Sequence, residues 1–278
     1  MTIVGTAEIL APAAAAGRGV GAFNVLHLET AEALVEAAES AGLPVILQIS
    51  ENCVAYHGAL APIARACSAL AEASTAAVSL HLDHAEEERL AREAIDLGFG
   101  SVMFDGAKLS YAENVTATRR VVQQAHAAGV FVEAELGEIG GKDGAHAPGV
   151  RTDPAEARDF VGRTGVDALA VAVGSSHAMS DRSATLDFGL IAHLAAAVPV
   201  PLVLHGSSGV ADDGIVRAVR AGITKVNVST HLNAHFTAAV RDTLAARPSL
   251  IDSRTFIAAG RRAVAAEAAR LMELIARG

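Results

Sequence analysis

The sequence has too little cysteine for a disulfide framework and no long hydrophobic run. Its two cysteines, Cys53 and Cys67, stand too far apart for a CxxC metal-binding motif. Cys67 lies in an alanine- and leucine-rich helical pattern and is predicted to be in the core, whereas Cys53 is interpreted as a bystander thiol. No apolar stretch approaches the ~20 residues of a membrane helix, and the first residues lack the pattern of a signal peptide. We therefore expect a cytoplasmic protein without a membrane partner.

Positive charge is also scarce. The chain has 22 Lys and Arg against 31 Asp and Glu, a formal net charge of −9. Nucleic acid is not an expected partner, because binding its phosphates requires a basic face. A small phosphorylated substrate needs no more than a local pocket and remains compatible with this charge.

Hydrophobic residues, in contrast, make up 51% of the chain and gather in eight short strand-like runs. The runs are rich in Val, Ile and Leu and are mostly continuous, which is typical of parallel strands covered on both faces. They span residues 20–25, 44–50, 77–83, 101–105, 131–137, 168–174, 201–206 and 224–229.

Alanine-rich amphipathic segments separate these runs, and most end in a glycine that can close a helix, as at Gly42 and Gly165. No GxGxxG loop follows the first run, so the eight repeats favour an α/β fold of the closed (β/α)8 TIM-barrel type over an open sheet. No linker divides the chain, and residues 1–278 are expected to form one domain. An extra N-terminal helix is predicted at about 6–16 and a long C-terminal helix at about 254–276. Residues 140–154 form the one long irregular loop, typical of a lid or binding element.

Polar side chains end these runs, and barrels place their chemistry at the carboxyl ends of strands. His84, His177 and His205 each follow a different run, and three neutral imidazoles can hold zinc while leaving one coordination position open. Asp83 would lie beside the metal, where a carboxylate can move protons. The other run ends carry Asn24, Ser50, Asp105, Glu135, Asn227 and Ser229.

The remaining histidines are interpreted as structural or solvated. His81 shares a strand face with Asp83 and is predicted to be a hydrogen-bonded interior histidine. His146 lies in the long irregular loop. The others are expected on loops or helix surfaces: His27, His57, His126, His193, His231 and His235.

Two glycine- or serine-containing turns, HGSSG at 205–209 and NVST at 227–230, lead from the last two runs into helices. Backbone N–H groups of such turns can cradle a phosphate. The alternative is that Ser208 or Thr230 simply caps a helix.

Lys225, one of three lysines with Lys108 and Lys142, leaves a second mechanism open. It shares a strand face with Asn227 and could form a Schiff base with a carbonyl substrate. Because it stands two residues, or ~6.6 Å, below Asn227, a buried structural cation is the preferred interpretation.

The motifs HLDH, VEAELG, LHGSSG and KVNVST together resemble the class II, zinc-dependent fructose/tagatose-bisphosphate aldolase family. AFNV, QISE, SVMFDGA, AVGSSH and DSRTF extend the resemblance over nearly the whole chain. The resemblance implies reversible cleavage of a fructose- or tagatose-bisphosphate-like ketose phosphate to dihydroxyacetone phosphate and an aldehyde. It implies that His84, His177 and His205 bind one catalytic Zn²⁺ and that Asp83 is the proton donor and acceptor.

The same resemblance implies further roles. Asp105 and Glu135 match acidic positions associated with a second or alternative metal site. Arg254 matches an arginine that reaches a neighbouring subunit's site to bind the distal phosphate, so a homodimer or homotetramer is implied. The substrate-binding residues that it implies are Asn24, Ser50, Gly206, Ser208, Asn227, Ser229 and Thr230.

The chain also departs from the family pattern. After His177 the usual Gly, aromatic residue and Lys are absent, and Ala178 replaces a glycine that shapes the phosphate and monovalent-cation site. Either the phosphate grip is altered or Arg182 supplies charge instead. Asp143 stands alone where acidic residues usually cluster, which puts a proton-shuttling role for it in doubt.

Two alternatives to the zinc aldolase remain open. One is a lysine aldolase acting through Lys225, and the other is a non-catalytic, sugar-phosphate-binding accessory subunit on the same barrel. The latter is disfavoured because Asp83 and the three histidines are retained. A metal-dependent hydrolase is disfavoured because the first run has no HxH pair.

Overall fold

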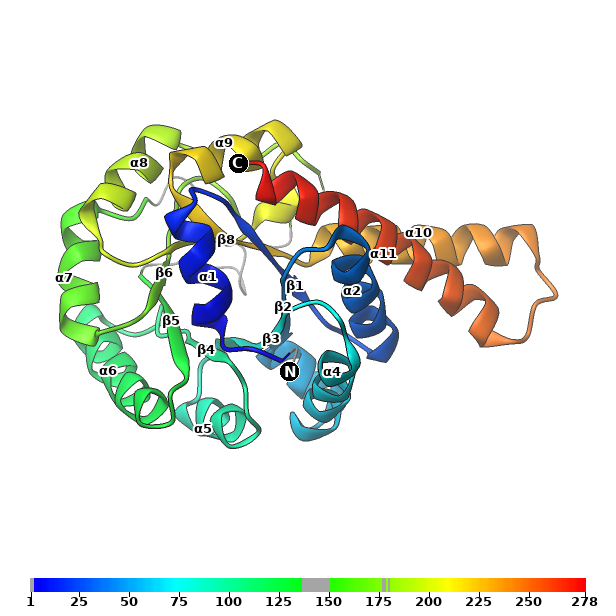
Figure 1. Cartoon of the computed structure of the whole chain (residues 1–278), viewed down its shortest axis with the longest axis horizontal. Helices are drawn as coiled ribbons and strands as arrows, with labels where there is room; N and C mark the ends of the chain where they lie inside the picture. Colours follow the sequence, from blue (N-terminus) through cyan, green and yellow to red (C-terminus); the bar gives the residue numbers. More distant parts are fainter. Residues whose placement is uncertain (1–2, 137–150, 177–178, 180) are drawn as a thin grey trace.

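The computed structural model describes residues 3–136, 151–176, 179 and 181–278, and its strands close into a parallel barrel (Figure 1). Each strand pairs with the next in sequence, and β8 pairs back with β1. The predicted (β/α)8 fold is therefore confirmed. The strands are β1 (Val20–Asn24), β2 (Val45–Ser50), β3 (Val78–Ala85), β4 (Ser101–Phe104), β5 (Phe131–Glu135), β6 (Ala168–Ala170), β7 (Leu202–Leu204) and β8 (Ile223–Val228).

Helices surround the barrel and cover the apolar outer faces of its strands (Figure 1). Gly42 and Gly165 close α2 and α7 with left-handed φ angles of 62° and 75°, as predicted. The helices of the described residues are α1 (Thr6–Ala15), α2 (Leu28–Ala41), α3 (Glu51–His57), α4 (Ala61–Ala73), α5 (Glu88–Asp96), α6 (Tyr111–Ala127), α7 (Pro154–Thr164), α8 (Phe188–Ala197), α9 (Asp212–Ala221), α10 (Thr230–Ala246) and α11 (Ser253–Ala276).

Among the strands that are shorter than predicted, β6 and β7 end early for clear local reasons. β6 ends at Ala170 instead of 174, because Thr152 takes both the N–H and the carbonyl of Ala172, at 2.8 and 3.0 Å. β7 ends at Leu204 instead of 206, because Gly206 adopts a φ of 66° and leads into a 3₁₀ turn. Both differences lie at the carboxyl end of the barrel, where loops replace the ladder.

The two ends of the chain add the extra helices that the sequence predicted. α1 lies across the amino-terminal end of the barrel, while α10 and α11 form a helical arm that projects beyond it (Figure 1). α11 packs along α2 as it returns to the barrel. No helix in the described residues is long and apolar enough to cross a membrane. Cys67, predicted to be in the core, is fully buried in α4, and burial raises the pKa of its thiol to about 12.

Candidate active site and metal centre

The carboxyl end of β3 carries Asp83 and His84 at a β-bulge. The register of β3 against β4 shifts between Leu82 and Ala85, so two residues of β3 oppose one residue of β4. His84 itself has a φ of 53°, in the left-handed region. In a regular strand Asp83 and His84 would face opposite sides of the sheet, whereas the bulge directs both to the mouth of the barrel. The prediction that the strand ends at 83 and that His84 begins a loop is therefore wrong.

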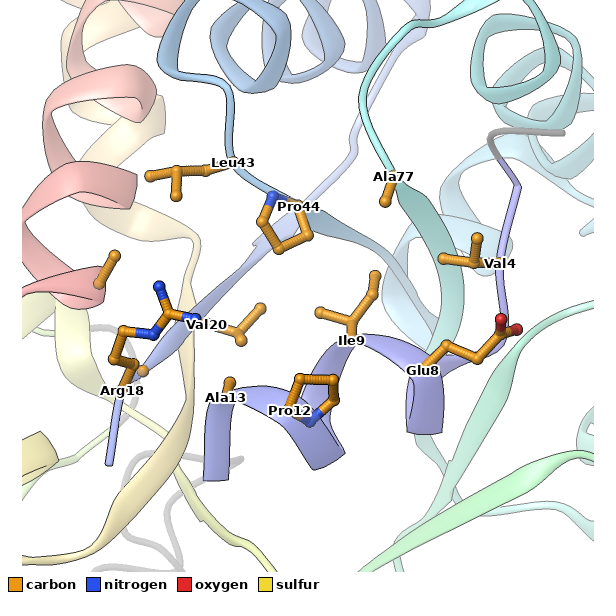
Figure 2. A pocket seen from close by; sticks show the side chains of 12 residues that line it. Val4, Glu8, Ile9, Pro12, Ala13, Arg18, Val20, Leu43, Pro44 and Ala77 are labelled. Carbon is orange, nitrogen blue, oxygen red and sulfur yellow. The ribbon is translucent and has the colours of Figure 1, made fainter. Parts of the chain in front are cut away.

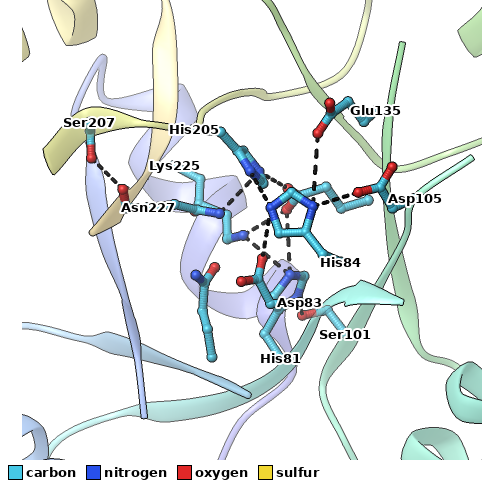
Figure 3. A network of polar contacts seen from close by, with 12 residues as sticks. His81, Asp83, His84, Ser101, Asp105, Glu135, His205, Ser207, Lys225 and Asn227 are labelled. Carbon is cyan, nitrogen blue, oxygen red and sulfur yellow. Dashed lines mark hydrogen bonds and ion pairs between the residues drawn. The ribbon is translucent and has the colours of Figure 1, made fainter. Parts of the chain in front are cut away.

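His84 and His205 meet at this mouth (Figure 3), one from β3 and the other from the residue that follows β7. Nε2 of His84 lies 3.0 Å from Nδ1 of His205. The other nitrogen of each ring contacts a carboxylate: His84 Nδ1 lies 2.7 Å from Asp105 Oδ2. His205 Nε2 lies 2.9 Å from Glu133 Oε1. All four side chains are buried.

These contacts favour a cation between the two rings. A neutral imidazole has one N–H donor and one acceptor nitrogen, and here each carboxylate takes the N–H of one ring. The two inner nitrogens then present their lone pairs to the same point, an arrangement that a bound cation stabilises. Metal-ligating histidines commonly bond a carboxylate through the other nitrogen in this way. Ligand atoms on a tetrahedral zinc ion lie about 3.3 Å apart, close to the separation observed here.

Asp83 belongs to the same group. Its Oδ1 lies 3.9 Å from His84 Nε2 and has no hydrogen-bond partner among the residues that the structure describes. Its Oδ2 accepts a hydrogen bond from Asn24 Nδ2 at 2.8 Å, and Gln48 Nε2 donates to Asn24 Oδ1 at 3.2 Å. Burial opposes ionisation of Asp83, but His84 and the bond from Asn24 contribute to a net lowering of the pKa of Asp83. One oxygen is thus held by Asn24, which leaves the other for the site.

Glu133, which was not predicted as a site residue, joins this mouth to the centre of the barrel. Its Oε2 accepts a hydrogen bond from Lys225 Nζ at 2.7 Å and lies 3.8 Å from His81 Nε2, all fully buried. Two features of the sequence could have indicated Glu133. Glu133 shares a face with Glu135 by the period of two, and a lysine inside a barrel requires an acidic partner.

His81 and Lys225 have the structural roles predicted for them. His81 Nδ1 lies 2.7 Å from Ser101 Oγ, and burial together with the charge of Lys225 holds the pKa of His81 well below its usual value. Lys225 is completely buried and bound to Glu133. The predictions of an interior histidine and a buried structural cation are confirmed.

Asp105 and Glu135 lie on the Nδ1 side of His84. Glu135 Oε2 is 4.0 Å from that nitrogen, and ligand atoms of His84, Asp105 and Glu135 all lie within 4.8 Å of one another. The same holds for Asp83, His84 and His205. The structure therefore brings together the described members of both predicted metal sets, and His84 is common to the two.

The turn after β7 and the start of α10 adjoin each other beside this centre. The Oγ of Ser208 accepts hydrogen bonds from the backbone N–H groups of Ser229 and His231, at 3.3 and 3.2 Å. Ser208 therefore caps α10, which is the alternative that the sequence left open. Asn227, on β8, places its amide nitrogen 3.0 Å from His205 Nε2. The predicted phosphate turns and the predicted metal ligands thus share one rim.

Other predicted site residues have different surroundings. The Oγ of Ser50 accepts from the N–H of Cys53 and caps α3. Arg182 donates to the carbonyl of Val210 and pairs with Asp212, at 2.8 and 2.6 Å. Arg254 is the second residue of α11, whose start lies at the outer end of the arm (Figure 1), and its side chain is 90% exposed. His177, Ala178, Asp143 and His146 lie outside the described residues.

A cavity of about 340 Å³ lies at the opposite end of the barrel, beneath α1 (Figure 2). Its lining is mostly apolar, with Ile9 on α1 and Val20 at the start of β1, and Glu8 and Arg18 at its edges. None of the predicted site residues that the structure describes lines it.

A closed β/α barrel with buried histidines and carboxylates at the carboxyl ends of its strands has the architecture of a barrel enzyme with a candidate metal centre. The chain matches the family described as fructose-bisphosphate aldolase class-II over residues 4–277. It is 40% identical to a fructose-bisphosphate aldolase of Geobacillus stearothermophilus over 96% of this chain and 94% of the relative. It is 39% identical to one of Thermus caldophilus, over 96% of each chain.

A solved structure gives the same result. The YdjI aldolase from Escherichia coli K12 superposes with a TM-score of 0.87 at 30% identity, covering 99% of this chain and 98% of that one. The chain belongs to the class II fructose-bisphosphate aldolase family, and it is a lyase. The family resemblance expected from the sequence is thereby confirmed. Members of this family act on sugar phosphates and are generally zinc-dependent.

Proposed function

We propose that this protein is a zinc-dependent ketose-bisphosphate aldolase. It cleaves a fructose- or tagatose-bisphosphate-like substrate reversibly to dihydroxyacetone phosphate and an aldehyde. The observation that carries the proposal is the convergence of Asp83, His84 and His205, whose ligand atoms lie within 4.8 Å of one another at the mouth of the barrel.

In this proposal His84, His177 and His205 hold one Zn²⁺, with Asp105 and Glu133 orienting the rings of His84 and His205. When bound, the ion supplies a Lewis acid that polarises the ketone and stabilises the charge that develops on its oxygen. Asp105 and Glu135 are a second or alternative metal site beside His84.

Asp83 moves the proton. In cleavage its carboxylate takes the proton of the C4 hydroxyl as the C3–C4 bond breaks, and in condensation it returns that proton. Asn24 holds one oxygen of Asp83 at 2.8 Å, so the other oxygen is kept aimed at the substrate. The low pKa of Asp83 keeps it ionised and ready to accept the proton.

The remaining rim residues bind the substrate. Backbone N–H groups at Gly206 and at the start of α10 receive the phosphate of the dihydroxyacetone phosphate half, and a monovalent cation accompanies this anion. Ser208 exchanges its present capping bonds for this anion. Asn227 lies against the carbon fragment, beside His205. The substrate-binding set is Asn24, Ser50, Gly206, Ser208, Asn227, Ser229 and Thr230.

Arg254 completes the site of a neighbouring copy. It is at the outer end of an arm that leads away from its own barrel, and Asp252 pairs with its guanidinium at 2.8 Å. A side chain in that place can reach a phosphate only in another subunit. The protein is therefore a homodimer or homotetramer in this proposal.

The burial of Lys225 favours the metal mechanism over the lysine mechanism. Schiff-base formation requires an amine that the substrate can reach, whereas this amine is fully buried and bound to Glu133.

Cleavage assays on a panel of ketose mono- and bisphosphates, with and without a chelator, test the proposal. We expect cleavage of a fructose or tagatose bisphosphate that a chelator abolishes and added zinc restores. Activity that survives metal removal, or trapping of the substrate on Lys225 by borohydride, would contradict it.

A further inference from the structure

We propose that His231 and His235 of α10, with Glu267 of α11, form a second metal-binding site, which binds a divalent transition-metal ion such as Zn²⁺. This cluster shares no residue with the centre at the mouth of the barrel. It lies instead at the base of the arm, between α10 and α11.

The positions of the three side chains suit a shared metal ion. His231 and His235 are four residues apart on α10, so both side chains lie on one helix face, the spacing by which helical histidine pairs bind zinc. Their ring centroids are 4.8 Å apart with an interplanar angle of 62°. Glu267 Oε1 lies 2.7 Å from His231 Nε2. Ligand atoms from all three residues lie within 4.8 Å of one another.

The types of side chain in the cluster also suit zinc. Two imidazoles and one carboxylate are a three-ligand set that zinc uses in proteins, with water in the fourth position. The side chains of His231 and Glu267 are 16% and 11% exposed, so solvent can reach the cluster. On a tetrahedral ion the ligand atoms would be about 3.3 Å apart, a small adjustment for side chains on two helix surfaces.

Ion pairing alone does not account for this cluster. Arg270 donates to both oxygens of Glu267, at 2.8 and 2.6 Å, and to Asp212. Arg182 pairs with Asp212 as well. Two guanidinium groups thus already balance two carboxylates, and the pair of histidines beside them is not needed for that balance. In the proposed site Arg270 is the outer partner that orients the Glu267 carboxylate.

An ion here would act on the rim of the barrel. The backbone N–H of His231 donates to Ser208 Oγ, so the ligand residue is itself part of the turn region at the start of α10. Joining α10 to α11 at this point would hold the first turn of α10 and the base of the arm together. Metal binding at this site should therefore stabilise the folded chain.

Metal content of the full-length protein tests the proposal. The protein is equilibrated with low micromolar free Zn²⁺, freed of unbound ion, and analysed by inductively coupled plasma mass spectrometry. We expect one ion per chain more in the wild type than in His235→Ala. We expect the same loss in His231→Gln, which keeps a hydrogen-bond donor for Glu267 but removes the ring nitrogen. His193→Ala, which removes an exposed histidine on α8, is the matched control and should keep the wild-type content.

A titration and a melting curve complete the test. Changes to residues that only support a metal ligand cost 10–100-fold in affinity, so loss of a ligand should weaken this site more than tenfold. Zn²⁺ should also raise Tm more in wild type than in His235→Ala. Equal metal content in wild type, His235→Ala and His231→Gln overturns the proposal. Complete loss of bound zinc in His84→Ala would also overturn it, because the second site should still hold its ion in that variant.

Discussion

The two ends of this barrel use polar groups in opposite ways. At the amino-terminal end Thr6 Oγ1 donates to Ser101 Oγ at 2.6 Å and lies 2.8 Å from Ser79 Oγ, so neutral hydroxyls satisfy one another beneath α1. At the carboxyl end charged groups are buried, and Asp83 Oδ1 has no hydrogen-bond partner in the described part of the chain. Asn227 Oδ1 at the same end shares that property.

This difference indicates that the polar groups at the amino-terminal end contribute to stability, whereas those at the carboxyl end are arranged for chemistry. Buried polar atoms without partners cost free energy, and a fold tolerates them where a ligand will engage them. The amino-terminal end, with its hydroxyl cluster and apolar cavity, needs no ligand to be satisfied. Substitutions at the two ends should therefore change different quantities, activity at one and folding at the other.

The largest effect is expected at Asp83. Asp83→Ala removes the carboxylate that is proposed to move the proton, so cleavage should slow by about 10²–10⁴-fold. Metal content should stay near wild type, because the histidines remain. Asp83→Asn, which can still accept the bond from Asn24, should be equally slow. A wild-type rate in either variant would remove Asp83 from the mechanism.

Lys225→Met should have the largest effect on stability. It leaves the Glu133 carboxylate buried without its cation, and breaking a buried pair in this way costs about 3–5 kcal/mol. Urea unfolding measures the change. Lys108→Met is the matched control, because that side chain is 50% exposed and pairs with Glu86 at the surface. A Lys225 variant as stable as its control would show that the buried pair contributes nothing.

Asp105→Asn should have an intermediate effect, confined to metal binding. Asp105 holds Nδ1 of His84 at 2.7 Å and thereby fixes the nitrogen that faces His205. Weakening such an outer partner typically lowers metal affinity 10–100-fold. Competition with a chelator measures this affinity, and activity at saturating metal should recover. Unchanged affinity would mean that Asp105 does not orient the ring.

The smallest effect is expected at the amino-terminal end. Thr6→Val removes the hydroxyl that joins Ser79 and Ser101, which should cost about 1 kcal/mol of folding free energy and leave the cleavage rate unchanged. Thr116→Val, at an exposed site on α6, should change stability less. A loss of activity in Thr6→Val would break the separation between the two ends.

Much of the fold could be predicted from the sequence, because each strand and helix carries its own pattern. Continuous apolar runs and glycine-closed helices placed all eight strands and both extra helices. The bulge in β3 could not be predicted in this way, because it depends on the register between β3 and β4. The early end of β6 depends on Thr152, which is distant in sequence.

Candidate site residues at the ends of strands could be predicted from the sequence, whereas those within a strand could not. Asp83, His84 and His205 were found by their position after apolar runs. Glu133 lies two residues before Glu135 within a strand, and the need for it follows from Lys225, nearly a hundred residues away. His231 and His235 were expected on a helix surface but are half-buried, because α11 covers that face of α10. Helix periodicity does not say which neighbour will pack against a face.

The left-handed backbone at His84 sets a limit on how this protein can be made more robust. A side chain in that conformation raises the energy of the native state by about 1–2 kcal/mol, which a glycine would recover. The same residue supplies the ring shared by both groups of residues that could hold a metal ion. Selection for heat resistance alone would favour relaxing position 84, and the relaxed chain would keep its barrel while losing a proposed ligand of its metal.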